Sequence, residues 1–298
     1  MPNAELEVRT YGSGARPRMG FFTDTSLCIG CKACEVACKE WNHVPDRIED
    51  WTGESYDNTR DLGADVWRHV AFIEQRVPVG ADGAARSLVQ SASAEGLAEE
   101  AGIETYQEGD GLRWLMASDV CKHCTDAACL DVCPTGALFR TEFGTVVVQE
   151  DVCNGCGYCV PACPFGVLDQ REEDGRVWKC TLCYDRLRDD MEPACAQACP
   201  TNSIQFGELA DLRERADRRL ERLTDAGQDQ ARLYLADEDD GVGGAGAFFL
   251  LLDEPEVYGL PPDPVATTRD LGSIWAATGA AAVALGAGLA AAVLGGRR

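Results

Sequence analysis

The chain has 298 residues, enough for one large domain or two smaller ones, and its 45% hydrophobic and 26% charged residues are typical of a folded protein. Its 50 acidic residues against 27 basic residues give a formal net charge of −23, which repels phosphate backbones and disfavours nucleic acid as a partner. The sixteen cysteines are too many to be incidental and too sparse for a small disulfide scaffold.

The N-terminal segment carries no export signal. Residues 1–20 contain three arginines but no apolar core, and Arg16-Pro17-Arg18 is not a twin-arginine pair. We therefore expect the chain to be made and folded in the cytoplasm.

The first cysteine group follows this segment, and its spacing is Cys28-x2-Cys31-x2-Cys34-x3-Cys38. This is the bacterial ferredoxin run, in which three cysteines bind one [4Fe–4S] cluster and the fourth serves the other cluster of a pair. After it, Val66 to Val77 and Arg113 to Met116 are predicted to form short strands. Residues 78–111, rich in Gly, Ala, Ser and Glu, are predicted to be an irregular surface excursion.

Three further cysteine groups complete the set, and none of the sixteen cysteines is left over. Their spacings are Cys121-x2-Cys124-x4-Cys129-x3-Cys133, Cys153-x2-Cys156-x2-Cys159-x3-Cys163 and Cys180-x2-Cys183-x11-Cys195-x3-Cys199. A proline follows each of these groups, and the third position of the turn after it is Gly136, Gly166 or Asn202. All three tolerate a positive φ, so we expect a tight turn and then a strand, repeated by duplication of one unit. Gly30, Gly155 and Gly157 let backbone N–H groups approach the sulfurs.

The order of the groups along the chain predicts which cysteines share a cluster. Only residues 134–152 separate the second group from the third, so these two form an inner two-cluster unit, and the first and fourth groups form an outer one. The predicted ligand sets are Cys28, Cys31, Cys34 and Cys199; Cys180, Cys183, Cys195 and Cys38; Cys121, Cys124, Cys129 and Cys163; and Cys153, Cys156, Cys159 and Cys133.

The histidines and a glycine-rich motif have less specific interpretations. His43, His69 and His123 are too few to indicate a haem site, and we expect surface or packing roles. The alternative for His123, which lies between two cysteines of the second group, is to tune its cluster by charge. Gly241 to Gly246 matches G-x-G-x-x-G, but an acidic run precedes it and a strand-like run, Phe248 to Leu252, follows. A dinucleotide fingerprint needs a strand before it and a helix after it, so a loop is expected here.

The C-terminal part contains two predicted helices of different kinds. Glu208 to Leu223 is amphipathic, with leucines on one face and arginines on the others. Ile274 to Leu294 is 21 residues without a charge, about 31 Å as a helix, and matches the hydrocarbon thickness of a membrane. Small residues at Gly279, Val283, Gly286 and Ala290 would let a helix of a partner subunit approach. Arg297-Arg298 favours a cytoplasmic C-terminus, with the cluster domain outside; the alternative is an Ala-rich soluble helix.

These predictions add up to an α+β fold: two ferredoxin-like two-cluster units, one inserted in the other, and a single C-terminal transmembrane helix. The expected boundaries are 1–118 for the first half of the outer unit, 119–170 for the inner unit, 171–207 for the second half of the outer unit, 208–272 for a helix and extension, and 273–296 for the anchor. Four clusters in a row form a path for electrons. The sequence offers no substrate pocket, nucleophile or acid–base pair, so no catalytic residue is expected.

Two other interpretations of the cysteines compete with clusters. Structural zinc also uses C-x2-C pairs, as in a zinc-binding interaction module, but zinc sites do not favour the C-x2-C-x2-C-x3-C-P run. A disulfide framework would require an exported chain, for which there is no signal.

The residues around the cysteines resemble a known family. Gly20 to Thr25, Cys38-Lys39-Glu40-Trp41-Asn42, Trp178 to Arg186, Glu192 to Cys195, Gly241 to Gly244 and Tyr258 to Pro261 resemble the iron–sulfur (beta) subunit of membrane-bound formate dehydrogenases over nearly the whole chain. The resemblance implies a molybdenum or tungsten bis-pterin catalytic (alpha) subunit that oxidises formate, and a membrane cytochrome b (gamma) subunit that reduces quinone. It also implies the same ligand pairing, and export together with a twin-arginine catalytic partner. Beta subunits of dimethyl-sulfoxide, nitrate and polysulfide reductases share the cysteine spacing and are the alternative.

Overall fold

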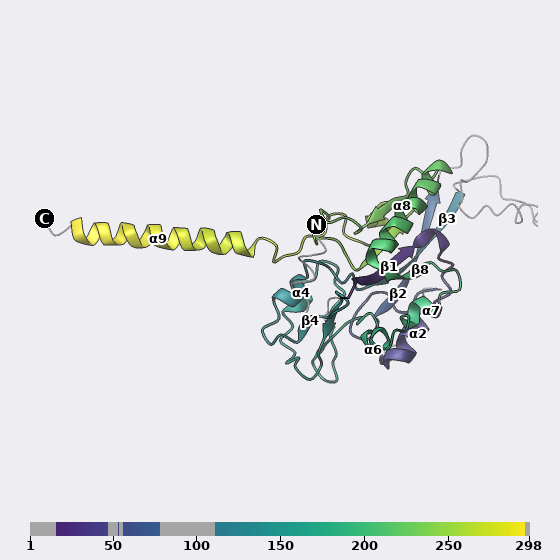
Figure 1. Cartoon of the computed structure of the whole chain (residues 1–298), viewed down its shortest axis with the longest axis horizontal. Helices are drawn as coiled ribbons and strands as arrows, with labels where there is room; N and C mark the ends of the chain where they lie inside the picture. The colour runs from purple at the N-terminus through teal and green to yellow at the C-terminus, as the bar shows by residue number, and fades with distance from the viewer. Residues whose placement is uncertain (1–15, 47–52, 54–55, 78–110, 296–298) are drawn as a thin grey trace, which may run out of the picture.

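The structure is a computed structural model that describes residues 16–46, 53, 56–77 and 111–295. Short helices and strands form one body, and a single long helix projects from it (Figure 1). The predicted mixture of helices and strands is confirmed.

A four-stranded sheet with the order β8-β1-β10-β9 lies at the centre of this body. Its strands are β8 (Ile204–Glu208), β1 (Met19–Asp24), β10 (Ala247–Leu251) and β9 (Arg232–Tyr234). β1 pairs antiparallel with β8 and parallel with β10, so segments from both ends of the body meet in one sheet. Side chains alternate along β1: Phe21 packs with the cysteines, and Phe22 packs in a second core on the other face.

The second core is covered by α8 (Leu209–Asp225), which confirms the amphipathic helix predicted for residues 208–223. Leu209, Leu212, Ala216 and Leu223 are buried, and the helix packs on β1, β8 and β9. β10 agrees with the strand predicted at Phe248 to Leu252, and it is buried along its whole length because both faces of the sheet are covered.

A long antiparallel hairpin lies beside this sheet. It consists of β2 (Arg68–Val77) and β3 (Gly111–Val120), paired from Arg68 with Val120 to Val77 with Gly111. The strand predicted at Arg113 to Met116 was too short, because the polar Ser118 and Asp119 broke the apolar pattern although their backbone pairs with β2. The excursion predicted for residues 78–111 lies, apart from Gly111, outside the described residues.

The cysteine groups lie in loops and very short elements. These are η1 (Thr25–Leu27), α2 (Ala33–Asn42), α4 (Ala128–Asp131), α5 (Cys159–Ala162), α6 (Tyr184–Arg188), α7 (Ala194–Gln197) and the hairpins of β4 (Leu138–Arg140) with β5 (Val146–Val148) and β6 (Asp169–Gln170) with β7 (Val177–Trp178). α2 packs against α7, and α4 against α5.

The turns predicted after three of the cysteine groups are present. Gly136, Gly166 and Asn202 have φ values of 70°, 63° and 55°. The strands β4, β6 and β8 begin two or three residues later, at 138, 169 and 204. The repeated turn-and-strand unit is therefore confirmed at all three places.

The glycine-rich run at Gly241 to Gly246 is a loop, as expected, and it supports the second cysteine group. The N–H of Thr125 donates to the Gly244 carbonyl at 2.9 Å, and the N–H of Asp126 donates to the Val242 carbonyl at 2.8 Å. A Cβ on Gly243 would lie 2.9 Å from Oδ2 of Asp126, so this close backbone approach requires glycine. Residues 255–258 then form η2 (Pro255–Tyr258).

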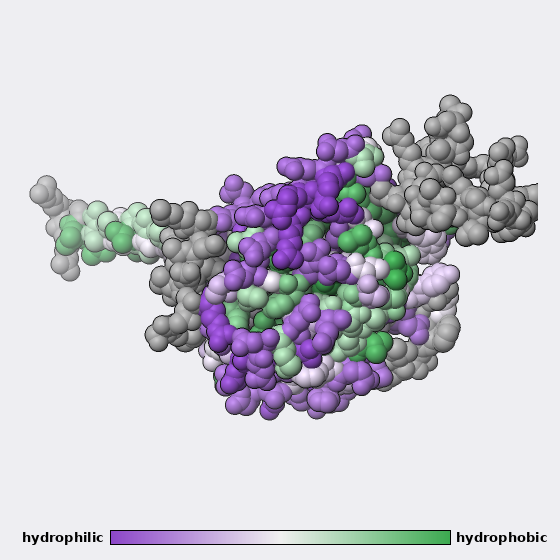
Figure 2. Space-filling model, turned by 45° about the vertical axis from the view of Figure 1, so that its right-hand side comes forward, coloured by the Kyte–Doolittle hydropathy of each residue, from purple (hydrophilic) through white to green (hydrophobic). Residues whose placement is uncertain are grey.

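The C-terminal helix α9 (Leu271–Gly295) projects from the body (Figure 1). Within the described residues it is the one helix long and apolar enough to cross a membrane, and it is exposed along its length. Figure 2 shows its apolar surface apart from the body, whose visible face is hydrophilic at the top and bottom and more hydrophobic in the middle. Arg297 and Arg298, on which the predicted orientation depends, lie outside the described residues.

Candidate iron–sulfur cluster site

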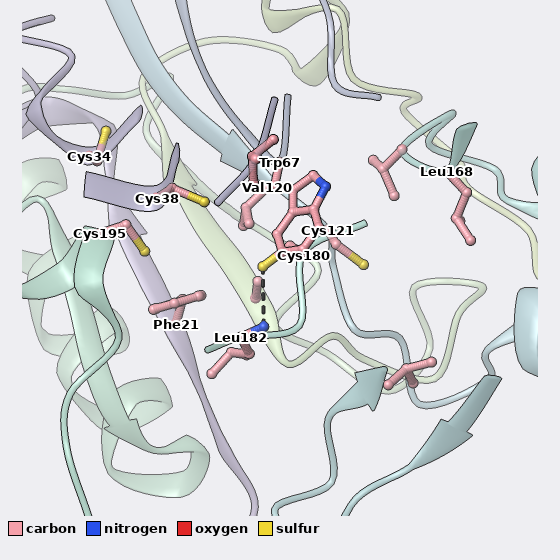
Figure 3. Close-up of a cluster of buried hydrophobic side chains, with 14 of the residues drawn as sticks. Phe21, Cys34, Cys38, Trp67, Val120, Cys121, Leu168, Cys180, Leu182 and Cys195 are labelled. Atoms are coloured by element: carbon pink, nitrogen blue, oxygen red, sulfur yellow. Dashed lines mark hydrogen bonds between the residues drawn. The ribbon is translucent and has the colours of Figure 1, made fainter. Parts of the chain in front are cut away.

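All sixteen cysteines are free thiols within the body. Seven are buried and two, Cys31 and Cys156, are exposed. The thiols share a core with Phe21, Trp67, Val120 and Leu182 (Figure 3). Cys34, Cys38 and Cys195 gather on one side of the view, and Cys121 and Cys180 lie beside Trp67.

The structure brings cysteines of the first and fourth groups together. Burial raises the pKa of the Cys28 thiol to about 11, a hydrogen bond from the Gly30 N–H lowers it, and its thiolate neighbours are Cys34, Cys199 and Cys31. Burial likewise raises the pKa of Cys38 well above its ordinary value, and its thiolate neighbours, in decreasing effect, are Cys180, Cys195 and Cys183.

Cysteines of the second and third groups also come together. Burial raises the pKa of Cys124 well above its ordinary value, and its thiolate neighbours are Cys121, Cys129 and Cys163. Burial raises the pKa of Cys159 to about 11; a backbone N–H lowers it, and its thiolate neighbours are Cys133, Cys153 and Cys156.

Three pairs of cysteines connect these sets of neighbours into one line. Besides burial, the neighbouring Cys195 raises the pKa of Cys34, and Cys121 raises the pKa of Cys180, so the two thiols of each pair lie close together. Cys129 and Cys159 make the third connection. The thiols therefore form four successive sets without a break.

Backbone geometry around the sulfurs agrees with the expected role of glycine in part. Gly30, Gly155 and Gly157 all have positive φ, between 64° and 73°. A Cβ on Gly30 would lie 2.5 Å from Cε1 of Phe72, so no side chain fits there. In the fourth group, the residue with positive φ that donates its backbone N–H to a sulfur is Leu182. Its φ is 57°, and its nitrogen lies 3.3 Å from the Cys180 Sγ (Figure 3).

Polar side chains near the sulfurs were not singled out from the sequence. Asn42 Nδ2 lies 3.7 Å from the Cys38 Sγ and 3.8 Å from the Cys183 Sγ, and so contacts cysteines of both outer groups. Thr135 and Thr201 place their hydroxyls 3.7 and 3.8 Å from Cys133 and Cys199. The signal in the sequence was the Pro-Thr pair that follows two of the groups.

Three buried cations lie among the thiols, and pattern analysis missed their role. Arg68, Lys122 and Lys179 are 1–2% exposed. Lys122 pairs with Asp119 and lies over the rings of Phe165 and Phe249. Lys179 donates to the Cys180 carbonyl at 2.8 Å and to the carbonyl of Val146. Positive charge in a low-dielectric core offsets the cost of burying thiolates.

The histidines lie in different surroundings: His123 and His69 are buried, and His43 is exposed, as expected for packing and surface roles. Burial lowers the pKa of His123 well below the ordinary value, with Lys179 and Arg140 adding to the effect. Its Nδ1 accepts the Val146 N–H at 3.1 Å, and the alternative in which it tunes a cluster by charge stays a prediction. His69 is buried beside Thr59, and His43 ends α2 with a φ of 50°.

The donor set fits iron–sulfur clusters. Within the described residues, no group of three Cys, His, Asp or Glu side chains is placed to hold one metal ion. The thiols lie in sets of four, the number of ligands that one [4Fe–4S] cube takes, and Nε and Nη2 of the buried Arg68 have no oxygen or nitrogen acceptor among the described residues. These donors suit the anionic sulfurs of a cluster.

Comparisons with known proteins agree with this chemistry. Two models of a 4Fe-4S dicluster domain match residues 27–137 and 112–209. Together with the sixteen cysteines they identify four [4Fe–4S] clusters as the cofactors, so the zinc interpretation is wrong.

Several relatives are iron–sulfur subunits of formate dehydrogenase. The chain is 38% identical to the nitrate-inducible formate dehydrogenase iron–sulfur subunit of Escherichia coli K12, over 90% of this chain and 79% of the relative. It is 39% identical to the formate dehydrogenase iron–sulfur subunit of Haemophilus influenzae, over 81% of this chain and 68% of the relative. A probable anaerobic dimethyl sulfoxide reductase chain of E. coli is 35% identical over 66% of this chain. The chain therefore belongs to the family of formate dehydrogenase iron–sulfur subunits, which transfer electrons and are not themselves catalytic.

Proposed function

We propose that the chain carries electrons from a molybdenum or tungsten subunit that oxidises formate to a membrane cytochrome b that reduces quinone. When bound, each [4Fe–4S] cluster accepts and releases one electron. The observation that supports a relay is the unbroken line of four thiol sets, with an exposed cysteine at each end and buried cysteines between. Buried thiols in the middle keep water from the path, and exposed ones give partners access.

The proposed ligand sets are the four predicted from the sequence. They are Cys28, Cys31, Cys34 and Cys199; Cys180, Cys183, Cys195 and Cys38; Cys121, Cys124, Cys129 and Cys163; and Cys153, Cys156, Cys159 and Cys133. In each set one thiol has the other three as its thiolate neighbours, which supports the exchange of every fourth cysteine between groups.

The nested arrangement of units is part of the same proposal. The antiparallel pairing of β1 with β8 and the packing of α2 on α7 support an outer unit made from residues 1–118 and 171–207. The packing of α4 on α5 supports an inner unit over 119–170. Residues 208–272 then cover the sheet with α8, and 273–296 form the anchor.

The surroundings of the two exposed cysteines support a protein partner at each end of the relay. Ile29 and Val36, next to Cys31, are 58% and 59% exposed, and Tyr158, near Cys156, is 63% exposed. Exposed apolar residues around a ligand favour a protein partner at that place. We assign the Cys31 end to the catalytic subunit and the Cys156 end to the cytochrome.

The attachment of α9 supports this assignment. Thr267 Oγ1 donates to the Ala162 carbonyl at 3.4 Å, and Thr268 Oγ1 donates to Oδ2 of Asp131 at 2.6 Å. Ala162 and Asp131 end α5 and α4, so the inner unit lies at the base of the membrane helix. The uncovered positions Gly279 and Gly286 suit a packed partner helix. We propose that the cluster domain lies outside the cytoplasm, as Arg297 and Arg298 indicate.

The complex purified from membranes tests the function. Formate should reduce the clusters and then a quinone analogue, and a chain lacking α9 should leave dye reduction by formate intact while quinone reduction is lost. If the complex instead oxidised quinol with dimethyl sulfoxide, nitrate or polysulfide as acceptor, the alternative suggested by the dimethyl sulfoxide reductase relative would replace the proposal.

A further inference from the structure

A buried arginine lies where the two outer clusters meet. Arg68 begins β2 and is 2% exposed. Its Cζ lies 4.9 Å above the centre of the Phe21 ring, and its Nη1 donates to the Oγ of Ser118 at 3.1 Å and to the Ser118 carbonyl at 3.3 Å. These contacts hold the guanidinium plane in one position.

Thiolates, rather than carboxylates, balance the charge of Arg68. None of the ion pairs among the described residues joins Arg68 to an acidic side chain. The thiols around the guanidinium are those of Cys195, Cys34, Cys180 and Cys38. A guanidinium stays charged in proteins, and this one faces two of the proposed ligand sets.

Two donors of this guanidinium, Nε and Nη2, are buried without an oxygen or nitrogen acceptor among the described residues, whereas Nη1 donates to Ser118. The guanidinium already turns to a thiol: burial raises the pKa of Cys195, and a hydrogen bond from Arg68 lowers it. Ser118 also links the arginine to the first group, because its Oγ lies 3.2 Å from the Cys34 Sγ. Buried N–H groups in native proteins almost always have a partner, and here sulfur is the acceptor at hand.

We propose that Arg68 is a positioning residue for electron transfer that donates hydrogen bonds to the sulfurs of both outer clusters and raises both reduction potentials. The assignment of Cys34 and Cys195 to two neighbouring clusters rests on the ligand sets proposed above. Reduction adds one electron and no proton, so negative charge on these sulfurs grows, and a fixed cation with free N–H donors favours the reduced state. Three of the four thiolates around Arg68 belong to the Cys180–Cys183–Cys195–Cys38 set, so that cluster is the more strongly affected.

A redox titration followed by EPR on the full-length chain with its clusters tests this inference. In Arg68→Met, two of the four midpoint potentials should fall and the other two should stay unchanged. Arg68→Lys keeps the positive charge but loses the planar guanidinium with its several N–H donors in fixed directions. The same two potentials should therefore fall less than in Arg68→Met. Arg218→Met is the matched control: it removes an exposed arginine whose partner is Glu214, and all four potentials should stay unchanged.

The inference is overturned if Arg68→Met holds full iron and leaves all four potentials unchanged, or moves all four alike. If Arg68→Met loses iron, Arg68→Lys is compared with the native chain instead. Two lowered potentials in Arg68→Lys support the role, and four unchanged ones overturn it. These readings need neither formate nor quinone, so they fail or succeed independently of the proposed electron donor and acceptor.

Discussion

At the scale of single residues, the fourth cysteine of each group is the one whose partner is least local. The Cys199 thiol follows α7 in the chain, yet it is a thiolate neighbour of Cys28. From its own segment, the Thr201 hydroxyl lies 3.8 Å from the Cys199 Sγ. The proposed exchange of fourth cysteines would therefore tie the beginning of the body to its end.

Replacing Cys199 tests this exchange. In Cys199→Ser, the cluster held by Cys28, Cys31 and Cys34 should be lost or converted, because serine is a poorer ligand for iron. EPR should show one cluster signal missing and the iron content should fall by about a quarter, since one cluster of four is affected. Cys38→Ser is the companion variant, and it should remove the Cys180–Cys183–Cys195 cluster instead. The reverse pattern in the two variants would contradict the pairing.

Gly30 shows how closely the first loop is packed. In Gly30→Ala, the new Cβ would meet Phe72 at 2.5 Å and the φ of 64° would also be strained, at a cost of about 1–2 kcal/mol for the backbone alone. We expect the variant to be isolated with less iron. Gly136→Ala is the matched control, with a φ of 70° and no atom within 4 Å of its Cβ. Equal iron loss in both variants would show that backbone strain, not crowding, is responsible.

The sequence predicts candidate ligands but not the cations among them. Iron–sulfur chemistry restricts the number and spacing of cysteines, so each candidate ligand can be predicted from the sequence, and the ligand sets stay a proposal. Arg68 lies 30 residues from the nearest cysteine before it, Cys38, and acts through the pairing of β2 with β3. Lys122 and Lys179 adjoin cysteines, but a lysine beside a cysteine gives no sign of whether it will be buried. Contacts made by tertiary folding leave no local pattern.

At the scale of elements, the four-stranded sheet separates two cores with different contents. One core contains the cysteines, and the other contains the apolar side chains covered by α8. One face of β1 carries Phe21 toward the clusters, and the other carries Phe22, which stacks on Phe248 with ring centres 5.3 Å apart. No strand was predicted at β1, because the adjacent Phe21 and Phe22 do not alternate with polar residues. The parallel pairing of β1 with β10 was not predicted either, because strands so distant in the chain share no turn that fixes their order.

Leu212 lies at the centre of the buried face of α8, which packs against this sheet. In Leu212→Ala, we expect the free energy of unfolding to fall by about 2–5 kcal/mol. Leu212 is fully buried, and its removal leaves a cavity that the surrounding side chains cannot fill. Anaerobic urea titration followed by visible absorbance should show cluster loss at lower urea. Leu220→Ala, on the same helix at a partly buried position, should change the midpoint less. Identical midpoints for the two variants would contradict the role of this face.

The helix α9 is attached to the body but does not support it. A chain that ends at residue 270 should leave the membrane fraction and keep its full iron content, because the described part of α9 is exposed along its length. Thr268→Ala, which breaks only the contact with Asp131, should stay in the membrane fraction. Cell fractionation with iron analysis measures both. A truncated chain without iron would show that α9 is needed for folding.

At the scale of the whole molecule, we expect the clusters to be the cross-links that hold the segments together. The described body has a short central sheet, one long hairpin and two small ones, and around the cysteines most helices have only four or five residues, apart from α2 with ten. Elements this short are marginal without tertiary support. The nested order of segments follows from the paired cysteines of ferredoxins, which tie distant groups together, and it stays a proposal.

Removal of the clusters should therefore unfold most of the body. Without them, seven buried thiols lose their iron, and buried donors such as Nε and Nη2 of Arg68 stay unpaired at about 1–3 kcal/mol each. The net stability of a domain is only about 5–15 kcal/mol, so a few such losses exhaust it. After anaerobic chelation of iron, near-UV circular dichroism should collapse, and rebuilding with iron and sulfide should restore it in proportion to about sixteen irons bound per chain. A chelated chain that kept its near-UV signal and melted cooperatively would show that the protein core, and not the metal, determines the fold.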